Sequence, residues 1–272
     1  MPDDGPGDCP MTMTGQTELL GLAAGALIAS VTAPVGVSGA VFLLPVQLSV
    51  LNVPSPAVTP TNLLFNVVAG PGALARYHRR GQLSGALTRL LILGTLPGVV
   101  VGAVIRVFAV PGPTVFRALV GLLLAPLGLW LCARTLRPPR GDRASAPSER
   151  FVVGLSLAVG TVGGVYGIGG GSILGPILVG RGMPVAQVAP AALASTFLTS
   201  VTGALTYAAL SFTAHGDIAP DWPLGLSCGL GGLAGGYLGA RLQPRLPETA
   251  LRLTLGALAT ALAFVYLVQA AA

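Results

Sequence analysis

The residues of this chain best suited to bind a ligand form a glycine cluster inside an apolar run. Residues 166–176 read YGIGGGSILGP, and the candidates for binding are Gly169, Gly170, Gly171 and Ser172. Glycine lets a helix end and lets a ligand approach the backbone closely. A helix that begins after such a break offers free N–H groups and a partial positive charge, which bind anions without a charged side chain. The cluster therefore indicates a helix-tip anion site.

A partner tip is expected from residues 36–45, which read GVSGAVFLLP and place Ser38 and Gly39 at the equivalent position. The alternative is that such glycines only permit close packing of helices. We prefer packing for glycines at four-residue spacing in regular spans, namely Gly98, Gly102, Gly231, Gly235 and Gly239. For the three consecutive glycines before Ser172 we prefer binding, because packing alone does not need them.

Uncharged polar side chains supply the other candidate contacts. In VTPTNLLFNVVAG, residues 58–70, Asn62 and Asn66 are four apart and share one helical face. The equivalent stretch of the second half, residues 189–203, carries Ser195 and Thr196. Amides inside a membrane usually face the protein interior or a pore. The alternative is that they only join helices by hydrogen bonds, and the sequence leaves both open for the asparagines.

Several kinds of chemistry are missing. None of the nine acidic residues falls in the middle of an apolar run, and cation pumps usually need a carboxylate there. Phosphate-loop, zinc-protease and serine-hydrolase motifs are absent, and the three cysteines are far apart. We therefore expect no enzyme, no metal, no cofactor and no nucleic acid, and a neutral or anionic substrate.

Composition defines the elements that hold these residues. Hydrophobic residues make up 53% of the 272 and charged residues 9%, whereas a soluble domain carries about 25% charged residues. We predict an all-α polytopic membrane protein with about eight full transmembrane helices, and two short segments at 37–51 and 172–182. The long spans are expected at 18–36, 57–76, 84–108, 114–136, 151–168, 186–211, 222–243 and 249–270.

The chain divides into two similar halves. We expect a polar N-terminal tail at 1–17, membrane repeats at 18–133 and 151–272, and a cytoplasmic linker rich in Pro and Arg at 134–150. GVSGAVFLLP matches GIGGGSILGP, and GTLPGVVVGA at 94–103 matches GGLAGGYLGA at 231–240. Between these motifs, Pro54, Pro60 and Tyr77 match Pro184, Pro190 and Tyr207. Such duplication is common in transporters, which bind substrate between their repeats.

The orientation of the repeats depends on whether the short segments cross the bilayer. Eight spans with the N-terminus inside would leave Arg106, Arg117, Arg181, Arg241, Arg245 and Arg252 outside. Ten segments with the N-terminus outside would leave only Arg106 and Arg117 there, and would make the repeats inverted. Because arginine prefers the cytoplasmic side, we favour the inverted arrangement, although the segments are short for a crossing.

These motifs together resemble one known family. GIGGGSILGPIL, its copy GVSGAVFLLPV, PTNLLFN leading into ALARYHRRGQL, and the arginine-rich linker are similar to those of the sulfite exporter TauE/SafE permeases. The resemblance covers residues 18–270, and it departs from the family pattern at Ser38 and Ala40, where glycines are usual. It implies a bacterial inner-membrane permease for small sulfur-containing anions or organic acids.

The leading hypothesis is therefore a secondary carrier that moves a small anion by alternating access between two repeats. An anion channel is the second hypothesis, and a non-transport membrane scaffold or enzyme is the third. The lipid bilayer and the anion are the expected partners. The sequence leaves open the substrate, the direction of transport, the coupling ion and whether the chain forms a homo-oligomer.

Overall fold

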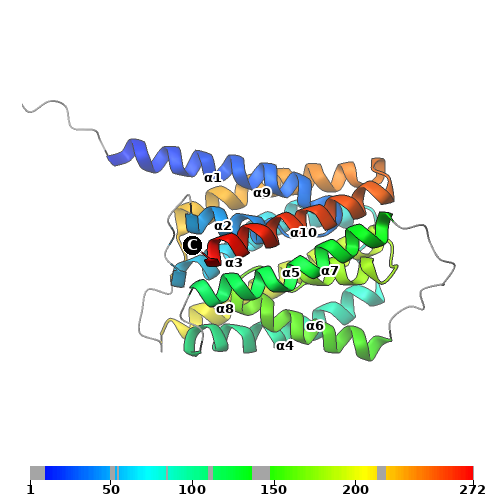
Figure 1. Ribbon diagram of the computed structural model, residues 1–272. Coiled ribbons are helices and arrows are strands. Elements are labelled where there is room, and N and C mark those ends of the chain that lie inside the picture. Colours follow the sequence, from blue (N-terminus) through cyan, green and yellow to red (C-terminus); the bar gives the residue numbers. More distant parts are fainter. Residues whose placement is uncertain are drawn as a thin grey trace, which may run out of the picture.

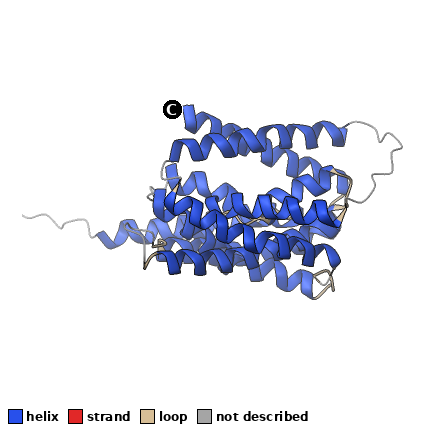
Figure 2. Ribbon diagram, turned by 90° about the horizontal axis from the view of Figure 1, so that it is seen from below, coloured by secondary structure: helices blue, strands red, loops and turns tan. Residues whose placement is uncertain are grey.

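The described part of the protein is built of helices, as expected. The computed structural model describes residues 10–49, 53, 55–83, 85–109, 113–136, 148–212 and 219–271, so the interior of the predicted linker lies outside it. The long helices in this part are α1 (Pro10–Thr32), α3 (Ser55–His78), α4 (Ala86–Phe108), α5 (Pro113–Leu136), α6 (Glu149–Tyr166), α8 (Val185–Leu210), α9 (Trp222–Leu242) and α10 (Glu248–Ala271). They lie alongside one another in a bundle with connections at its two ends (Figure 1, Figure 2).

Two short helices follow the glycine-rich breaks, and the predicted breaks are confirmed. α1 continues into the 3₁₀ turn η1 (Ala33–Val35) and stops at Gly36, and α6 stops at Gly167. The φ angles of these glycines are 78° and 67°, in the left-handed region that glycine adopts at little cost. Helices α2 (Ala40–Ser49) and α7 (Gly171–Gly180), of 10 residues each, begin directly after the breaks.

The start of α1 differs from the expectation. The helix begins at Pro10, eight residues before the expected span, so part of the predicted polar tail is helical. Met, Thr and Gln in this region are compatible with a helix, and a polar turn can extend an apolar helix into water. Glu18 consequently lies within α1. The acidic residues Glu149, Asp221 and Glu248 lie at helix starts.

Glycines bring the long helices together in pairs. A Cβ atom on Gly98 or Gly102 of α4 would lie 2.4 and 2.1 Å from carbonyl oxygens of Leu157 and Thr161 in α6. The same holds between α9 and α1, where a Cβ on Gly231, Gly235 or Gly239 would lie 1.9–2.5 Å from carbonyl oxygens. Only glycine permits such an approach of two backbones, so the predicted packing role of these glycines is confirmed.

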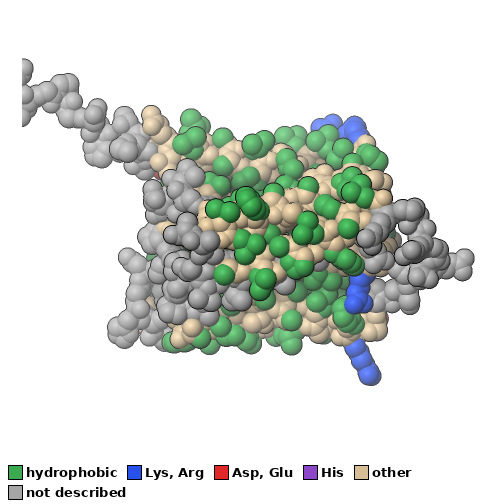
Figure 3. Space-filling view, viewed as in Figure 1, with side chains coloured by type: hydrophobic (Ala, Val, Ile, Leu, Met, Phe, Trp, Pro, Cys, Tyr) green, Lys and Arg blue, Asp and Glu red, His purple; other side chains and the backbone are tan. Residues whose placement is uncertain are grey.

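Arginines mark one end of the bundle, which we name the arginine end. There Arg80 Nη1 donates to Ala240 O at 3.3 Å, which joins the end of α3 to the end of α9. The Arg181 guanidinium stacks 4.1 Å above the ring of Phe151 at the start of α6. Partial burial and the charges of Arg76 and Arg245 lower the pKa of Arg80. Figure 3 shows basic side chains gathered at this end, at the right of the view.

The opposite end holds the start of α1 and the end of α10 (Figure 1). Among the arginines whose side chains the structure describes, Arg106 lies toward this end, in the last turn of α4.

Four helices in the described part are long and apolar enough to cross a membrane: α1 with η1, α4, α8 and α10.

Candidate functional site

The two helix breaks meet in the centre of the bundle. The backbone N–H of Ser38, in the first break, donates to the hydroxyl of Ser172 at 3.2 Å. That hydroxyl donates to Ile168 O at 3.0 Å, back across the second break. Residues more than 130 positions apart in the sequence are thus in direct contact at the positions where the backbone is irregular. Polar backbone groups inside a membrane must be satisfied by the protein or by a cavity.

Both predicted asparagines take part in this junction. The Ser38 hydroxyl donates to Asn66 Oδ1, and Asn66 Nδ2 donates to Gly167 O at 3.5 Å. Asn62 Nδ2 donates to Ala40 O at 3.2 Å, in the first turn of α2. The two asparagines share one face of α3, as their four-residue spacing predicted, and this face binds both breaks. Both asparagines thus join helix segments by hydrogen bonds, which leaves their role in binding a prediction, and Asn62 Oδ1 has no protein partner.

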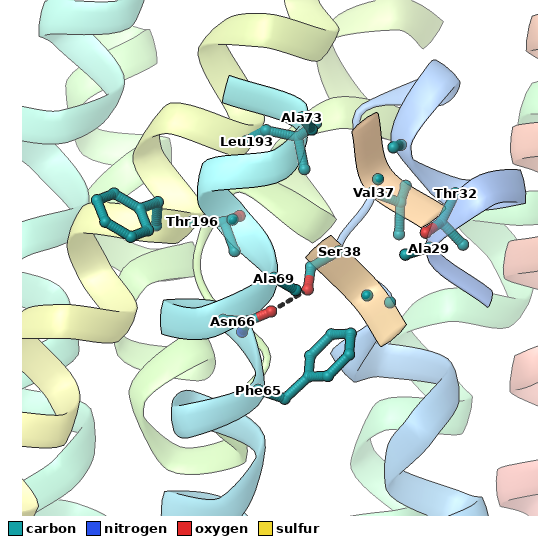
Figure 4. A pocket seen from close by; sticks show the side chains of 16 residues that line it. Ala29, Thr32, Val37, Ser38, Phe65, Asn66, Ala69, Ala73, Leu193 and Thr196 are labelled. Carbon is teal, nitrogen blue, oxygen red and sulfur yellow. Dashed lines mark hydrogen bonds between the residues drawn. The ribbon is translucent and has the colours of Figure 1, made fainter. Parts of the chain in front are cut away.

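A cavity of about 40 Å³ lies beside this junction, between α1, α3, α8 and α9 (Figure 4). Four of the predicted binding residues line it: Ser38, Gly39, Asn66 and Thr196. Most of the remaining wall is apolar, with Phe65 and Phe197 among its members. Among the described residues that line the cavity, none carries a charge. A ligand here would meet neutral hydrogen-bonding groups and apolar side chains.

Two threonines of this cavity have hydroxyls that no protein group satisfies. Thr32 comes from the last turn of α1 and Thr196 from α8, and they are 2% and 3% exposed. Neither Oγ1 atom has a hydrogen-bond partner. They lie on either side of the Ser38–Asn66 pair in Figure 4. A buried hydroxyl left unsatisfied costs about 1–3 kcal/mol, so a ligand that bonds to both would recover stability that the protein alone does not have.

Thr32 was not among the residues expected from the sequence. Its signal there is weak, because a threonine four residues before a glycine is common in apolar helices. Its counterpart in the second half, counting from the left-handed glycines, is Gly163. The hydroxyl therefore belongs to the first half alone, and only the position of the cavity identifies it.

The remaining predicted residues surround the junction without lining the cavity. A Cβ on Gly169 would lie 2.5 Å from Thr196 Cγ2, one on Gly170 2.6 Å from Thr95 Cγ2, and one on Gly171 1.8 Å from Ala192 O. Gly170 N–H donates to Thr199 Oγ1 at 3.5 Å, and the Ser195 hydroxyl is 2.9 Å from that of Thr95. The tip of α7 is thus occupied by side chains of α4 and α8 in this conformation.

The described residues contain no group of three His, Cys, Asp or Glu side chains placed to hold a metal ion. The chemistry that this arrangement supports is reversible binding by hydrogen bonds, because no described group at the junction is an evident nucleophile paired with a base.

Comparison with known proteins gives two matches. The sequence model described as "Sulfite exporter TauE/SafE" matches residues 21–266, which include both breaks and the cavity. The chain is also similar to a protein of Xylella fastidiosa (strain Temecula1) named "Probable membrane transporter protein". The two are 25% identical over 239 residues, which cover 86% of this chain and 88% of the relative.

Proposed function

This chain is a membrane protein that belongs to the sulfite exporter TauE/SafE family, and we propose that it is a secondary carrier of a small anion. The anion is a sulfur-containing oxyanion, an organosulfonate or an organic acid. The name of the Xylella fastidiosa relative, a probable membrane transporter, supports a transport role. The carrier would lie in the bacterial inner membrane as a multi-pass protein.

We propose that two inverted repeats, 18–133 and 151–272, build the carrier. Each contributes four long helices and one short helix, α2 or α7, that reverses the chain. Helices of one repeat pack against helices of the other, since α1 lies against α9 and α6 lies against α4. These equivalent contacts support the division into two repeats. With ten segments, the start of α1 and the end of α10 lie at the same end of the bundle, in keeping with Figure 1. The arginine end would face the cytoplasm, because arginine is enriched in cytoplasmic loops.

The substrate would bind in the cavity beside the helix breaks. Ser38, Asn66 and Thr196 are the proposed contacts, with Thr32 added by its unsatisfied hydroxyl. Gly39 lets the substrate approach the backbone. Asn62, Ser172 and Ser195 would hold the breaks in register, and the second glycine cluster would contribute N–H groups once α7 separates from α8.

The observation that carries this proposal is a cavity lined by two buried hydroxyls without a protein partner, one from each half of the chain. A hydroxyl donates a hydrogen bond to an oxyanion without placing a permanent charge in the membrane, so an anion can bind and also leave. A carboxylate in the wall would repel an anion, and the described lining residues contain none. The arginines at one end would raise the local concentration of anions.

Binding can be tested with the purified protein in detergent. We would measure the shift in melting temperature with sulfite, thiosulfate, sulfate, sulfoacetate, short carboxylates and chloride, since a ligand that binds only the folded state stabilises it. We expect one anion class to shift the wild type, and the shift to be lost in Thr32→Val and Thr196→Val. Thr260→Val is the control, because that hydroxyl is already bonded to Gly256 O in α10. Equal shifts in all three variants would contradict the proposed site.

Counterflow in proteoliposomes separates a carrier from a channel. Vesicles loaded with the unlabelled anion should transiently accumulate the labelled anion above equilibrium if the protein is a carrier, because one binding site alternates between the two sides. A channel gives no such overshoot, and its flux follows the membrane voltage.

A further inference from the structure

Two buried tyrosines occupy equivalent positions near the ends of α3 and α8. Tyr77 is 0% exposed and its hydroxyl donates to Ala33 O at 3.1 Å. Tyr207 is 3% exposed and its hydroxyl donates to Gly164 O at 3.0 Å. Both acceptors lie three residues before the left-handed glycine of their own half, Gly36 or Gly167. Each tyrosine thus ties a long helix to the helix end that precedes a break.

Each tyrosine is packed in an apolar cluster, and the two clusters match. The Tyr77 cluster contains Ala33, Ala73, Leu193 and Ala240. The Tyr207 cluster contains Leu63 and Ala103. By the correspondence of the halves, Leu63 is equivalent to Leu193 and Ala103 to Ala240. The leucine is exchanged, since α8 supplies Leu193 to the Tyr77 cluster and α3 supplies Leu63 to the Tyr207 cluster.

The Tyr77 cluster lies between the cavity and the arginine end. Three of its members, Ala33, Ala73 and Leu193, also line the cavity. Tyr77 itself is one helical turn beyond Ala73, toward the end of α3. Beyond Tyr77, Arg80 donates to the carbonyl oxygen of Ala240, another member of the cluster. Going along α3 toward its C-terminal end, the chain therefore passes first the cavity, then the Tyr77 cluster and finally the arginines.

The Tyr207 cluster lies toward the opposite end. Val185 N–H, at the start of α8, donates to Glu248 Oε1 at 2.9 Å, and Glu248 also pairs with Arg252 in the first turn of α10. α8 therefore begins at the arginine end, and Tyr207 lies in its last turn. Tyr77 lies in the last turn of α3, which ends at the arginine end. The two clusters are thus on opposite sides of the helix breaks.

We infer that Tyr77 and Tyr207 are the two gates of the transport cycle, one toward each side of the membrane. This inference rests on the proposed carrier function. A carrier must break one barrier while the other holds, and two barriers in equivalent positions can alternate. Breaking the Tyr77 bond would free η1 and the first break from α3 and open the cavity to the arginine end. Breaking the Tyr207 bond would free the end of α6 and open the opposite side.

The test measures the accessibility of a cysteine in the cavity wall. Ala69→Cys, on α3, would be introduced into a chain with Cys9, Cys132 and Cys228 replaced by alanine, and labelled with a membrane-impermeant thiol reagent. Two membrane preparations of opposite orientation are used. Phe212→Cys, which follows α8 and is 89% exposed, identifies the preparation that presents the end opposite the arginines.

Tyr77→Phe should raise the labelling rate of Ala69→Cys about 5-fold from the arginine end only, since a hydrogen bond of ordinary strength shifts a two-state equilibrium by about this factor. Tyr207→Phe should raise the rate from the opposite end only. Tyr266→Phe is the matched control, because that buried hydroxyl also donates to a carbonyl, Val41 O at 3.2 Å, outside both clusters. It should leave both rates unchanged.

Equal increases from both ends, or the same increase in Tyr266→Phe, would overturn the gate assignment and indicate a general loosening of the bundle. Unchanged rates in both tyrosine variants would overturn it as well. The assay needs no substrate, so it can contradict the gate assignment whether or not the protein is an anion carrier. If the two variants open opposite ends but no anion changes the rates or shows counterflow, the gates stand and the anion assignment fails.

Discussion

The first helix break, residues 36–40, and the second, residues 167–171, are similar in backbone plan and differ in contents, and the second has a further left-handed glycine, Gly169, with a φ of 70°. Each starts at a left-handed glycine, leads into a helix of 10 residues and follows a carbonyl held by a tyrosine. In the first break Ser38 bonds to Asn66 and a cavity adjoins it. In the second, Thr95 and Thr196 fill the space against the glycines.

This difference shows how two similar helix breaks can adjoin a single asymmetric cavity. The shared features keep two helix ends, each bonded to a tyrosine, in matching positions. The side chains then decide which break offers room for a ligand. Asn66 and Thr196 are equivalent by sequence, yet the side chain of Asn66 makes two hydrogen bonds to the breaks while the Thr196 hydroxyl has no protein partner.

The largest effect should come from giving the second break the residue of the first. Gly171 is equivalent to Ala40, but a Cβ on Gly171 would lie 1.8 Å from Ala192 O. Because a backbone carbonyl cannot move aside, Gly171→Ala should destabilise the fold by more than about 3 kcal/mol, above the usual range for overpacking. Thermal melting in detergent would measure it. A melting temperature close to that of the wild type would show that α7 is not packed on α8 as described.

The next effect concerns the polar link between the breaks. Asn66→Ala removes the acceptor of the Ser38 hydroxyl and the donor to Gly167 O. It should destabilise the protein by about 1–3 kcal/mol, because buried groups are left unpaired. Asn66→Asp is a useful second variant, since it keeps the acceptor and loses the donor. If both variants have the melting temperature of the wild type, the two breaks are not joined through α3.

Thr196→Val should act in the opposite direction on stability. The methyl group preserves the shape, and the change removes a buried hydroxyl that has no protein partner. We expect stability to rise by about 1 kcal/mol while anion binding falls, as residues kept for function often do not favour stability. The melting temperature of one preparation, measured with and without the anion, tests both the stability and the binding. A loss of stability would mean that the hydroxyl is satisfied in the folded protein.

The smallest effect is expected on the outer face of α6. Gly154 has no atom within 4 Å of its would-be Cβ, and its counterpart in α1 is Ala23. Gly154→Ala should be neutral or stabilising by about 0.5–1 kcal/mol, the helix preference of alanine over glycine. Gly160→Ala on the inner face is the contrast, because its Cβ would meet Thr95 O at 2.6 Å and should destabilise. Equal melting of the two variants would contradict the assigned packing of α6.

Much of the fold followed from the sequence, because apolar length and glycine position are local properties. Apart from α1, the long helices begin and end within two residues of their expected ranges. The glycine-rich breaks and the close packing of Gly98 and Gly231 were also predicted. The start of α1 was not predicted, since no signal in the polar sequence before the apolar run marks where the helix begins.

The candidate site was likewise predictable from the sequence only in part. The sequence by itself determined that uncharged side chains and helix breaks would carry the chemistry, because the chain has no carboxylate in the middle of its apolar runs. Only the tertiary structure decided which break adjoins a cavity, that Thr32 and Thr196 both line it, and that Tyr77 and Tyr207 lie on opposite sides of the breaks. These facts depend on contacts between helices that are distant in the sequence, where a difference of one methyl group fills or opens the space.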